Sequence, residues 1–188
     1  GIDKPEYMTG ESFLKDDFNR KYVYAARDQW DEIMDKSRAI VTKKWKYIRN
    51  YKPEIPYDAG QAYLEFYRPA VHIMRTAKSK NLLTNAQLHF FKESKDLEEL
   101  YDLENDPHEI NNLALDPSFQ NVMNKFRIDM EEYNKRYRPM SDEYEPIIAE
   151  SVVILEWVKK NRPEEYKRML DGYEIGFSKS KDEYYKNN

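Results

Sequence analysis

Residues 98–117 read EELYDLENDPHEINNLALDP, and this stretch decides how the centre of the chain is organised. Its first part, EELYDLE (98–104), is rich in aromatic and apolar residues and predicts a short strand. At its end, Asp116 followed by Pro117 is typical of a helix N-terminus, since Asp caps free N–H groups and Pro is tolerated at the first helical position. The stretch therefore predicts a strand that leads into a capped helix.

The residues between this strand and this helix allow two interpretations. Asp106, His108 and Glu109 are types that bind divalent metal ions. Alternatively, Asp106 caps a helical turn, Pro107 occupies its first position, and Glu109 reaches back to the cap N–H. Adjacent residues at the start of a helix point in different directions, so they rarely converge on one ion. We favour the capping interpretation and predict no metal site here.

A long amphipathic helix is expected after Pro117. Its apolar positions recur at intervals of three and four residues, the period of one helix face. These positions are Phe119, Val122, Met123, Phe126, Met130, Tyr133 and Tyr137.

Strands are also expected in the first third of the chain. Three runs rich in Tyr, Val, Ile and Trp predict them: KYVYAARD (21–28), RAIVT (38–42) and WKYIRNY (45–51). Only Lys43-Lys44 separates the last two, which predicts a tight antiparallel hairpin, although Lys-Lys suits the primed turn types poorly. QWDEIMDKS (29–37) is expected to be a connector or a short helix.

Shorter helices are expected elsewhere. One covers 59–79, where Pro69 should break or kink it, and one covers 83–93 with Thr84 as N-cap. Pro146 and Pro163 open two more. The predicted class is α+β: a small antiparallel sheet of about four strands packed against a long C-terminal amphipathic helix, with extra helices after residue 138. We divide the chain into domains 1–137 and 138–188.

Composition excludes several classes of function. The 188 residues carry a net charge of −4 and no cysteine, so disulfides and thiolate chemistry are excluded. No apolar run approaches the ~18 residues of a membrane span. Residues 36–52 hold seven bases interleaved with Trp45, Tyr47 and Tyr51, as in single-strand nucleic-acid binders. A half-buried hairpin with a basic face explains them better, and we predict no nucleic-acid partner.

ARDQWDE (26–32) is the most suggestive short run for binding. Arg27 can grip an anionic group bidentately, Asp28 and Glu32 can accept hydrogen bonds from sugar hydroxyls, and Trp30 can stack on a sugar face. These groups follow a predicted strand, a frequent position for functional residues. Local salt bridges with a core tryptophan explain the same residues equally well, so both interpretations stay open.

Taken in order, these segments resemble the C-terminal subdomain of sulfatases of the alkaline-phosphatase-like superfamily. The similarity is greatest to bacterial polysaccharide sulfatases and heparan N-sulfatase. It covers about residues 1–137, and its most specific phrase is ELYDLENDPHEINNLA (99–114). Other matching segments are PEYMTGESFL, KYVYAARDQWDE, RAIVTKKWKYIRNY and LTNAQLHFF.

The resemblance implies a substrate-side and structural part of an enzyme that removes sulfate groups from sulfated sugars. Family catalysis needs a Cys or Ser in a C/S-x-P-x-R motif, which these 188 residues lack, so the chain should be inactive alone. The implied partners are an N-terminal catalytic domain and a sulfated carbohydrate. Calcium is implied for the full-length enzyme and no cofactor for this chain, and the implied location is periplasmic or secreted.

The resemblance also implies where substrate contact occurs. The subdomain docks against the catalytic domain and can contribute loops to the substrate pocket, so Arg27, Asp28 and Glu32 are the predicted substrate-binding residues. Relatives often carry a base where this chain has Val41, which argues against a binding role for the hairpin. The alternative function is a stand-alone binding or protein-interaction module without enzymatic activity.

Overall fold

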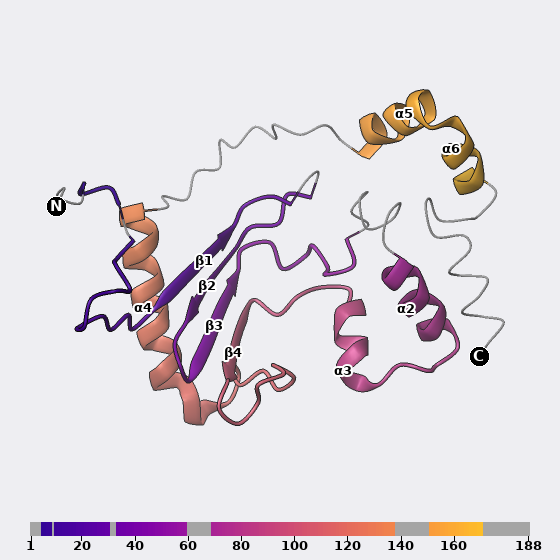
Figure 1. The fold of residues 1–188 in the computed structure, drawn as a ribbon. Coiled ribbons are helices and arrows are strands. Elements are labelled where there is room, and N and C mark those ends of the chain that lie inside the picture. The colour runs from indigo at the N-terminus through magenta and orange to yellow at the C-terminus, as the bar shows by residue number, and fades with distance from the viewer. Residues whose placement is uncertain (1–4, 9, 31–32, 60–68, 138–150, 171–188) are drawn as a thin grey trace.

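A four-stranded antiparallel sheet forms the centre of the fold. The computed structural model describes residues 5–8, 10–30, 33–59, 69–137 and 151–170 (Figure 1). The strands lie side by side in chain order, β1-β2-β3-β4. They are β1 (Val23–Arg27), β2 (Ser37–Val41), β3 (Trp45–Asn50) and β4 (Glu98–Asp102). All four predicted strands and the antiparallel hairpin are confirmed.

The β2–β3 hairpin has a turn built on a threonine. The Thr42 hydroxyl accepts hydrogen bonds from the backbone N–H groups of Lys44 (3.2 Å) and Trp45 (2.7 Å). Among the described residues, only Asn81 and Glu109 are non-glycine residues with positive φ, so the turn is not of a primed type. These hydrogen bonds to the Thr42 side chain stabilise a tight turn that contains the Lys43-Lys44 pair.

The core lies between the sheet and one long helix, α4 (Gln120–Tyr137), which crosses one face of the sheet (Figure 1). The Tyr47 ring stacks on Phe126 with 5.8 Å between centroids, and Tyr24 stacks on Tyr133 at 3.9 Å. Each large apolar side chain buried here contributes about 1.5–3 kcal/mol. The buried cluster comprises Ile40, Tyr47, Leu100, Ala114, Met123, Phe126 and Met130. The predicted α+β class and the amphipathic helix are confirmed.

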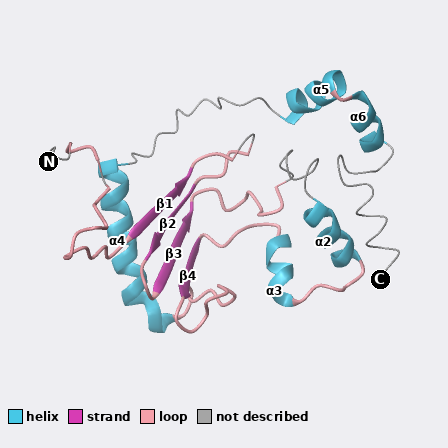
Figure 2. Cartoon of the chain, viewed as in Figure 1, coloured by secondary structure: helices cyan, strands magenta, loops and turns pink. Residues whose placement is uncertain are grey.

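Short helices complete the described chain (Figure 2). Thr84 caps α3 through a capping box with Gln87, as predicted. Pro69 is the first residue of α2, and residues 60–68, over which the predicted helix would reach this proline, lie outside the described chain. The remaining helical elements are α2 (Pro69–Ser79), α3 (Asn85–Leu88), η1 (His89–Phe91), η2 (Pro117–Phe119), α5 (Ser151–Asn161) and α6 (Pro163–Leu170).

The helices after residue 138 are described in part. Pro163 opens α6 as predicted, whereas Pro146 lies outside the described residues. The domain boundary at 138 stays a prediction. No helix in the described part of the chain is both long and apolar enough to cross a bilayer.

The predicted helical turn at Asp106-Pro107-His108-Glu109 is wrong. These residues form a turn in which the Asp106 carboxylate accepts the backbone N–H groups of Ile110 (2.9 Å) and Asn111 (2.7 Å). Glu109 has φ 55°, which no right-handed helix allows, and its carboxylate binds Lys46 at 2.5 Å instead of a cap N–H. In contrast, Asp116 caps the next helix as predicted, accepting the N–H of Ser118 at 2.8 Å.

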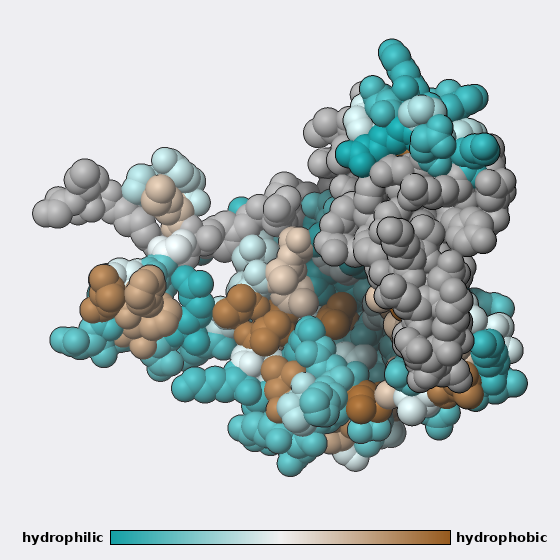
Figure 3. Space-filling model, turned by 45° about the vertical axis from the view of Figure 1, so that its right-hand side comes forward, coloured by the Kyte–Doolittle hydropathy of each residue, from teal (hydrophilic) through white to brown (hydrophobic). Residues whose placement is uncertain are grey.

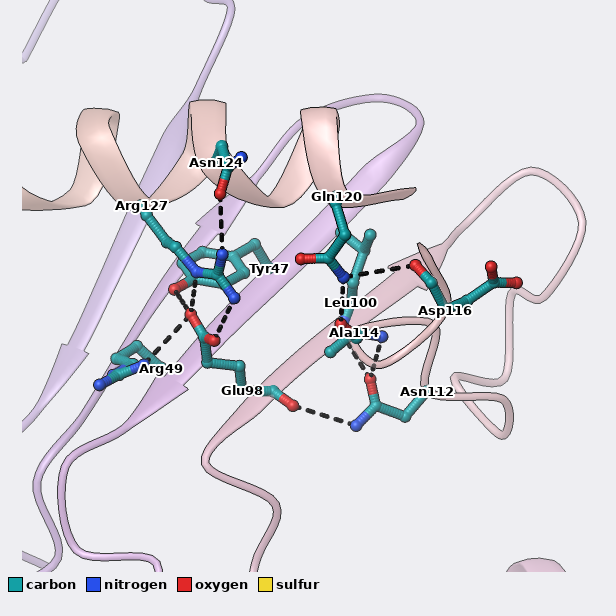
Figure 4. A network of polar contacts seen from close by, with 10 residues as sticks. All are labelled: Tyr47, Arg49, Glu98, Leu100, Asn112, Ala114, Asp116, Gln120, Asn124 and Arg127. Atoms are coloured by element: carbon teal, nitrogen blue, oxygen red, sulfur yellow. Dashed lines mark hydrogen bonds and ion pairs between the residues drawn. The ribbon is translucent and has the colours of Figure 1, made fainter. Parts of the chain in front are cut away.

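Asn112 closes the outer edge of the sheet (Figure 4). β4 is an edge strand, and unpaired edge groups need partners. The Asn112 Oδ1 atom accepts the N–H of Leu100 (2.9 Å) and of Ala114 (3.0 Å), while Nδ2 donates to the Glu98 carbonyl (3.1 Å). Next to it, the Leu113 N–H donates to the Leu100 carbonyl at 2.8 Å. The NNLA phrase thus serves as a partner for β4.

Replacing Asn112 should destabilise the fold. Asn112→Ala leaves two N–H groups of buried residues without an acceptor, so we expect a loss of about 2–4 kcal/mol in the free energy of unfolding, measured by urea titration. Asn111→Ala, which removes an exposed neighbouring amide, should change it by less than about 0.5 kcal/mol. Equal losses in the two variants would contradict the role of Asn112.

Candidate functional site

The predicted residue Arg27 lies at the end of β1 in a buried ion-pair cluster. Its guanidinium contacts the carboxylate of Asp35, which also contacts the ammonium group of Lys95. The side chains of Lys95 and Asp35 are 0% and 7% exposed, whereas that of Arg27 is 37% exposed. A buried carboxylate needs compensating charge, and Asp35 has it from two sides. The buried Asp35 carboxylate therefore holds the Arg27 guanidinium in place, while part of the Arg27 side chain remains exposed to solvent.

Asp28 has a partner on the next strand. Its Oδ1 atom lies 2.5 Å from Nη2 of Arg38, whose side chain is only 2% exposed. Nη1 of Arg38 donates to the carbonyls of Arg27 (3.0 Å) and Ser37 (2.9 Å). Arg38 thus ties the end of β1 to the start of β2.

The loop after β1 turns tightly. The backbones of Trp30 and Ile33 exchange two hydrogen bonds, of 2.8 and 2.9 Å, so residues 29–37 form a connector and not a helix where the structure describes them. Trp30 is 40% exposed and is not a core residue. Glu32 lies outside the described residues. The structure thus brings Arg27, Asp28 and Trp30 together at one end of the sheet, and their contact with a substrate stays a prediction.

A second buried polar group lies on the same face. Arg27, Ser37 and Asn50 are in register across β1, β2 and β3, on the face opposite α4. There the buried Glu99 carboxylate accepts hydrogen bonds from Asn50 (2.6 Å), Tyr57 (2.8 Å) and Tyr101 (2.7 Å). Burial and the charge of Glu99 raise the pKa of Tyr57, and burial and the hydrogen bond to Glu99 raise that of Tyr101. Both phenols stay protonated and act as donors.

Sequence reasoning missed the partners of the predicted residues. Asp35, Arg38 and Lys95 are all buried, and they hold Arg27 and Asp28. One signal was available, because Arg38 shares its strand face with the core residue Ile40, where an apolar residue is expected. Lys95 gave no such signal, since it lies on a loop far along the chain.

On the α4 side of the sheet, Glu98 joins β3, β4 and α4 (Figure 4). Its carboxylate accepts hydrogen bonds from the Tyr47 hydroxyl (2.6 Å) and from Nε and Nη2 of Arg127 (2.8 and 2.6 Å). Nη1 of Arg49 lies 3.2 Å away. The hydrogen bonds from Arg127, aided by Tyr47 and the charge of Arg49, lower the pKa of Glu98 to about 2.

This lowered pKa predicts how stability changes in acid. The unfolded chain protonates Glu98 near the ordinary glutamate pKa of 4.5 and the folded chain near 2, so the stabilisation is complete above pH 4.5 and is lost as the pH falls to about 2. The side chain is only 13% exposed, and a shift of this size corresponds to roughly 3 kcal/mol.

Substitution of the carboxylate tests this assignment. Urea titrations between pH 5 and pH 2 measure how much free energy of unfolding the protein loses on acidification. In Glu98→Gln this loss should be smaller than in the wild type, by up to roughly 3 kcal/mol. Glu104→Gln, at an exposed carboxylate 3.5 Å from Lys44, should keep the wild-type profile. A wild-type profile in Glu98→Gln would overturn the assignment.

The three histidines do not form a metal site. His89 and His108 line a cavity with Glu109, but Glu109 is paired with Lys46, and the His89 ring lies beside Tyr57 with 5.8 Å between centroids. Among the described residues, no group of three or more His, Asp and Glu side chains is placed to hold a metal ion. The residues that the structure describes therefore do not fit the calcium ion that the family resemblance implies.

Comparison with known proteins relates the centre of the chain to a known protein family. Residues 57–136 match the family model described as N-sulphoglucosamine sulphohydrolase, C-terminal. Two proteins from Formosa agariphila, both named ulvan-active sulfatase, are 37% identical over 134 residues and 30% identical over 141. These alignments cover 70% and 67% of this chain but only 22% and 24% of the relatives, so the chain spans under a quarter of their length.

A solved structure of a 2-O GAG sulfatase is also similar, with a TM-score of 0.46 and 18% identity over 77% of this chain and 25% of that one.

Proposed function

Since residues 57–136 belong to the family of sulfatase C-terminal domains, we propose that this chain is the C-terminal, substrate-side part of a sulfatase acting on a sulfated polysaccharide. The observation that carries the proposal is the family match, which spans β4, the turns at Asp106 and Asp116, and α4 up to its last residue but one. The identity of 37% to a protein named as ulvan-active supports a polysaccharide as the substrate class. Catalysis and calcium binding then belong to an N-terminal domain outside these residues.

The segment before β1 supports a partner domain. It exposes large apolar side chains: Tyr7 (79%), Phe13 (76%) and Leu14 (81%). Hydrophobic surface lies in several separate groups on the face shown in Figure 3, between hydrophilic residues. Neighbouring apolar side chains at this exposure are typical of a surface that another protein part covers. The proposed cover is the catalytic domain of the same protein.

The proposed substrate contacts lie at the end of β1. Arg27 offers a partly exposed guanidinium fixed by Asp35, and Trp30 offers an exposed ring. Asp28 is 21% exposed and can accept from a sugar hydroxyl while Arg38 holds it. Glu32, two residues after Trp30, belongs to the same proposal on sequence grounds alone.

Sulfate release tests the proposed function. A longer protein that contains this chain and a C/S-x-P-x-R motif should release sulfate from a sulfated polysaccharide such as ulvan, measured by ion chromatography. The 188-residue chain alone should release none. Turnover by the isolated chain, or none by the longer protein once its nucleophile is matured, would reject the proposal.

Arg27→Ala in that longer protein tests the substrate contact. Loss of one charge-assisted contact should raise KM about tenfold and change kcat less. The fold should persist, because Asp35 keeps Lys95 as its partner. Arg20→Ala, at an exposed arginine before β1, is the matched control and should leave KM unchanged. Unchanged KM and kcat in Arg27→Ala would remove this residue from the site.

A further inference from the structure

A cavity of about 650 Å³ lies between the end of β3 and the second half of α4. Its size is within the range of small-ligand pockets. Tyr47 and Arg49 line it from the α4 side of the sheet, whereas Arg27 lies on the opposite face. The complete lining consists of Tyr47, Arg49, Tyr51, Arg127, Met130, Glu131, Asn134 and Lys135.

One residue that lines the cavity carries a buried polar atom without a hydrogen-bond partner in the described part of the chain. Asn134 is only 7% exposed, and its Nδ2 atom donates to the Tyr51 hydroxyl at 3.1 Å. Its Oδ1 atom is buried and accepts no hydrogen bond from any described residue. An unpaired buried oxygen is costly, so this position favours a ligand that brings a hydroxyl or amide donor.

The charges of the cavity favour an anion. Arg49, Arg127 and Lys135 line it, against the carboxylates of Glu131 and of Glu98, which both arginines contact. Three bases against two acids leave one positive charge in excess. Lys135 is exposed and forms no ion pair within the described part of the chain, so its ammonium group can meet a ligand without breaking an existing contact.

We propose that this cavity binds a sugar unit that carries an anionic group, with its hydroxyls donating to Asn134 Oδ1 and Glu131 and its anionic group facing Lys135 and Arg127. One ligand then supplies both the donors and the negative charge that the cavity lacks. The Tyr51 ring, with the Arg49 guanidinium 5.9 Å from its centroid, adds an aromatic wall. The inference rests on the proposed function for its ligand class and gives that function a second point of substrate contact.

Binding by the 188-residue chain tests the cavity directly. The probe is a purified sulfated ulvan oligosaccharide, titrated by isothermal calorimetry beside its desulfated form and inorganic sulfate. We expect Lys135→Gln and Asn134→Leu each to weaken binding about fivefold, as the loss of one ligand hydrogen bond would. Lys43→Gln removes an exposed charge at the opposite end of the hairpin and should change the affinity less than about twofold, as a distant surface charge does.

Each alternative has its own outcome. Equal weakening in Lys43→Gln and Lys135→Gln means diffuse attraction and overturns the proposal, as does inorganic sulfate binding as tightly as the oligosaccharide. No oligosaccharide binding by the folded chain also overturns it. If the substitutions weaken the attachment of a catalytic domain without changing oligosaccharide binding, the cavity is a contact between domains and the proposal is overturned. Sulfate release by the longer protein tests the proposed function separately, so the two can fail independently.

Discussion

The carboxylate of Glu98 is the interaction on which the assembly of this fold depends. Tyr47 comes from β3, Arg127 from α4, and Glu98 from β4, which lies far along the chain from β3. A carboxylate that satisfies donors from two other elements fixes both the register of β4 and the rotation of α4. Leu100 on β4 and Phe126 on α4 both belong to the buried hydrophobic cluster, so this alignment places residues of both elements in the core. Asn112 closes the free edge of the same strand, so both sides of β4 are specified by side chains.

Local signals in the sequence were enough to predict most of the fold. Strand composition, the helical spacing from Phe119 onward and the caps at Thr84 and Asp116 each depend on residues within a few positions of one another. The family resemblance at 99–114 lies inside the matched region and is confirmed. The hairpin turn was only half explained, because the hydroxyl of Thr42 replaces the turn residues that a tight hairpin normally needs.

Features that depend on distant partners were not predictable in this way. The turn at Asp106 looked helical because its first residues suit a cap, but Lys46, on β3, draws the Glu109 carboxylate away. The ion pair between Asp35 and Lys95 joins two loops that only the folded sheet brings together. For the same reason, the sequence identified Arg27 and Asp28 as charged groups at a strand end but did not reveal what holds them.

The two faces of the sheet are stabilised by different interactions, and this difference bears on how the proposed binding residues at the end of β1 are oriented. The α4 face is held by the apolar cluster together with the Glu98 network, whereas the other face buries the charges of Asp35 and Lys95, whose desolvation offsets much of their attraction. Apolar side chains in place of Asp35 and Lys95 would give comparable stability, but they would not direct the Arg27 guanidinium. We infer that this cluster contributes orientation more than stability. The proposed contact of Arg27 and Trp30 with a ligand would require that kind of support, because a binding site needs its side chains held in one geometry.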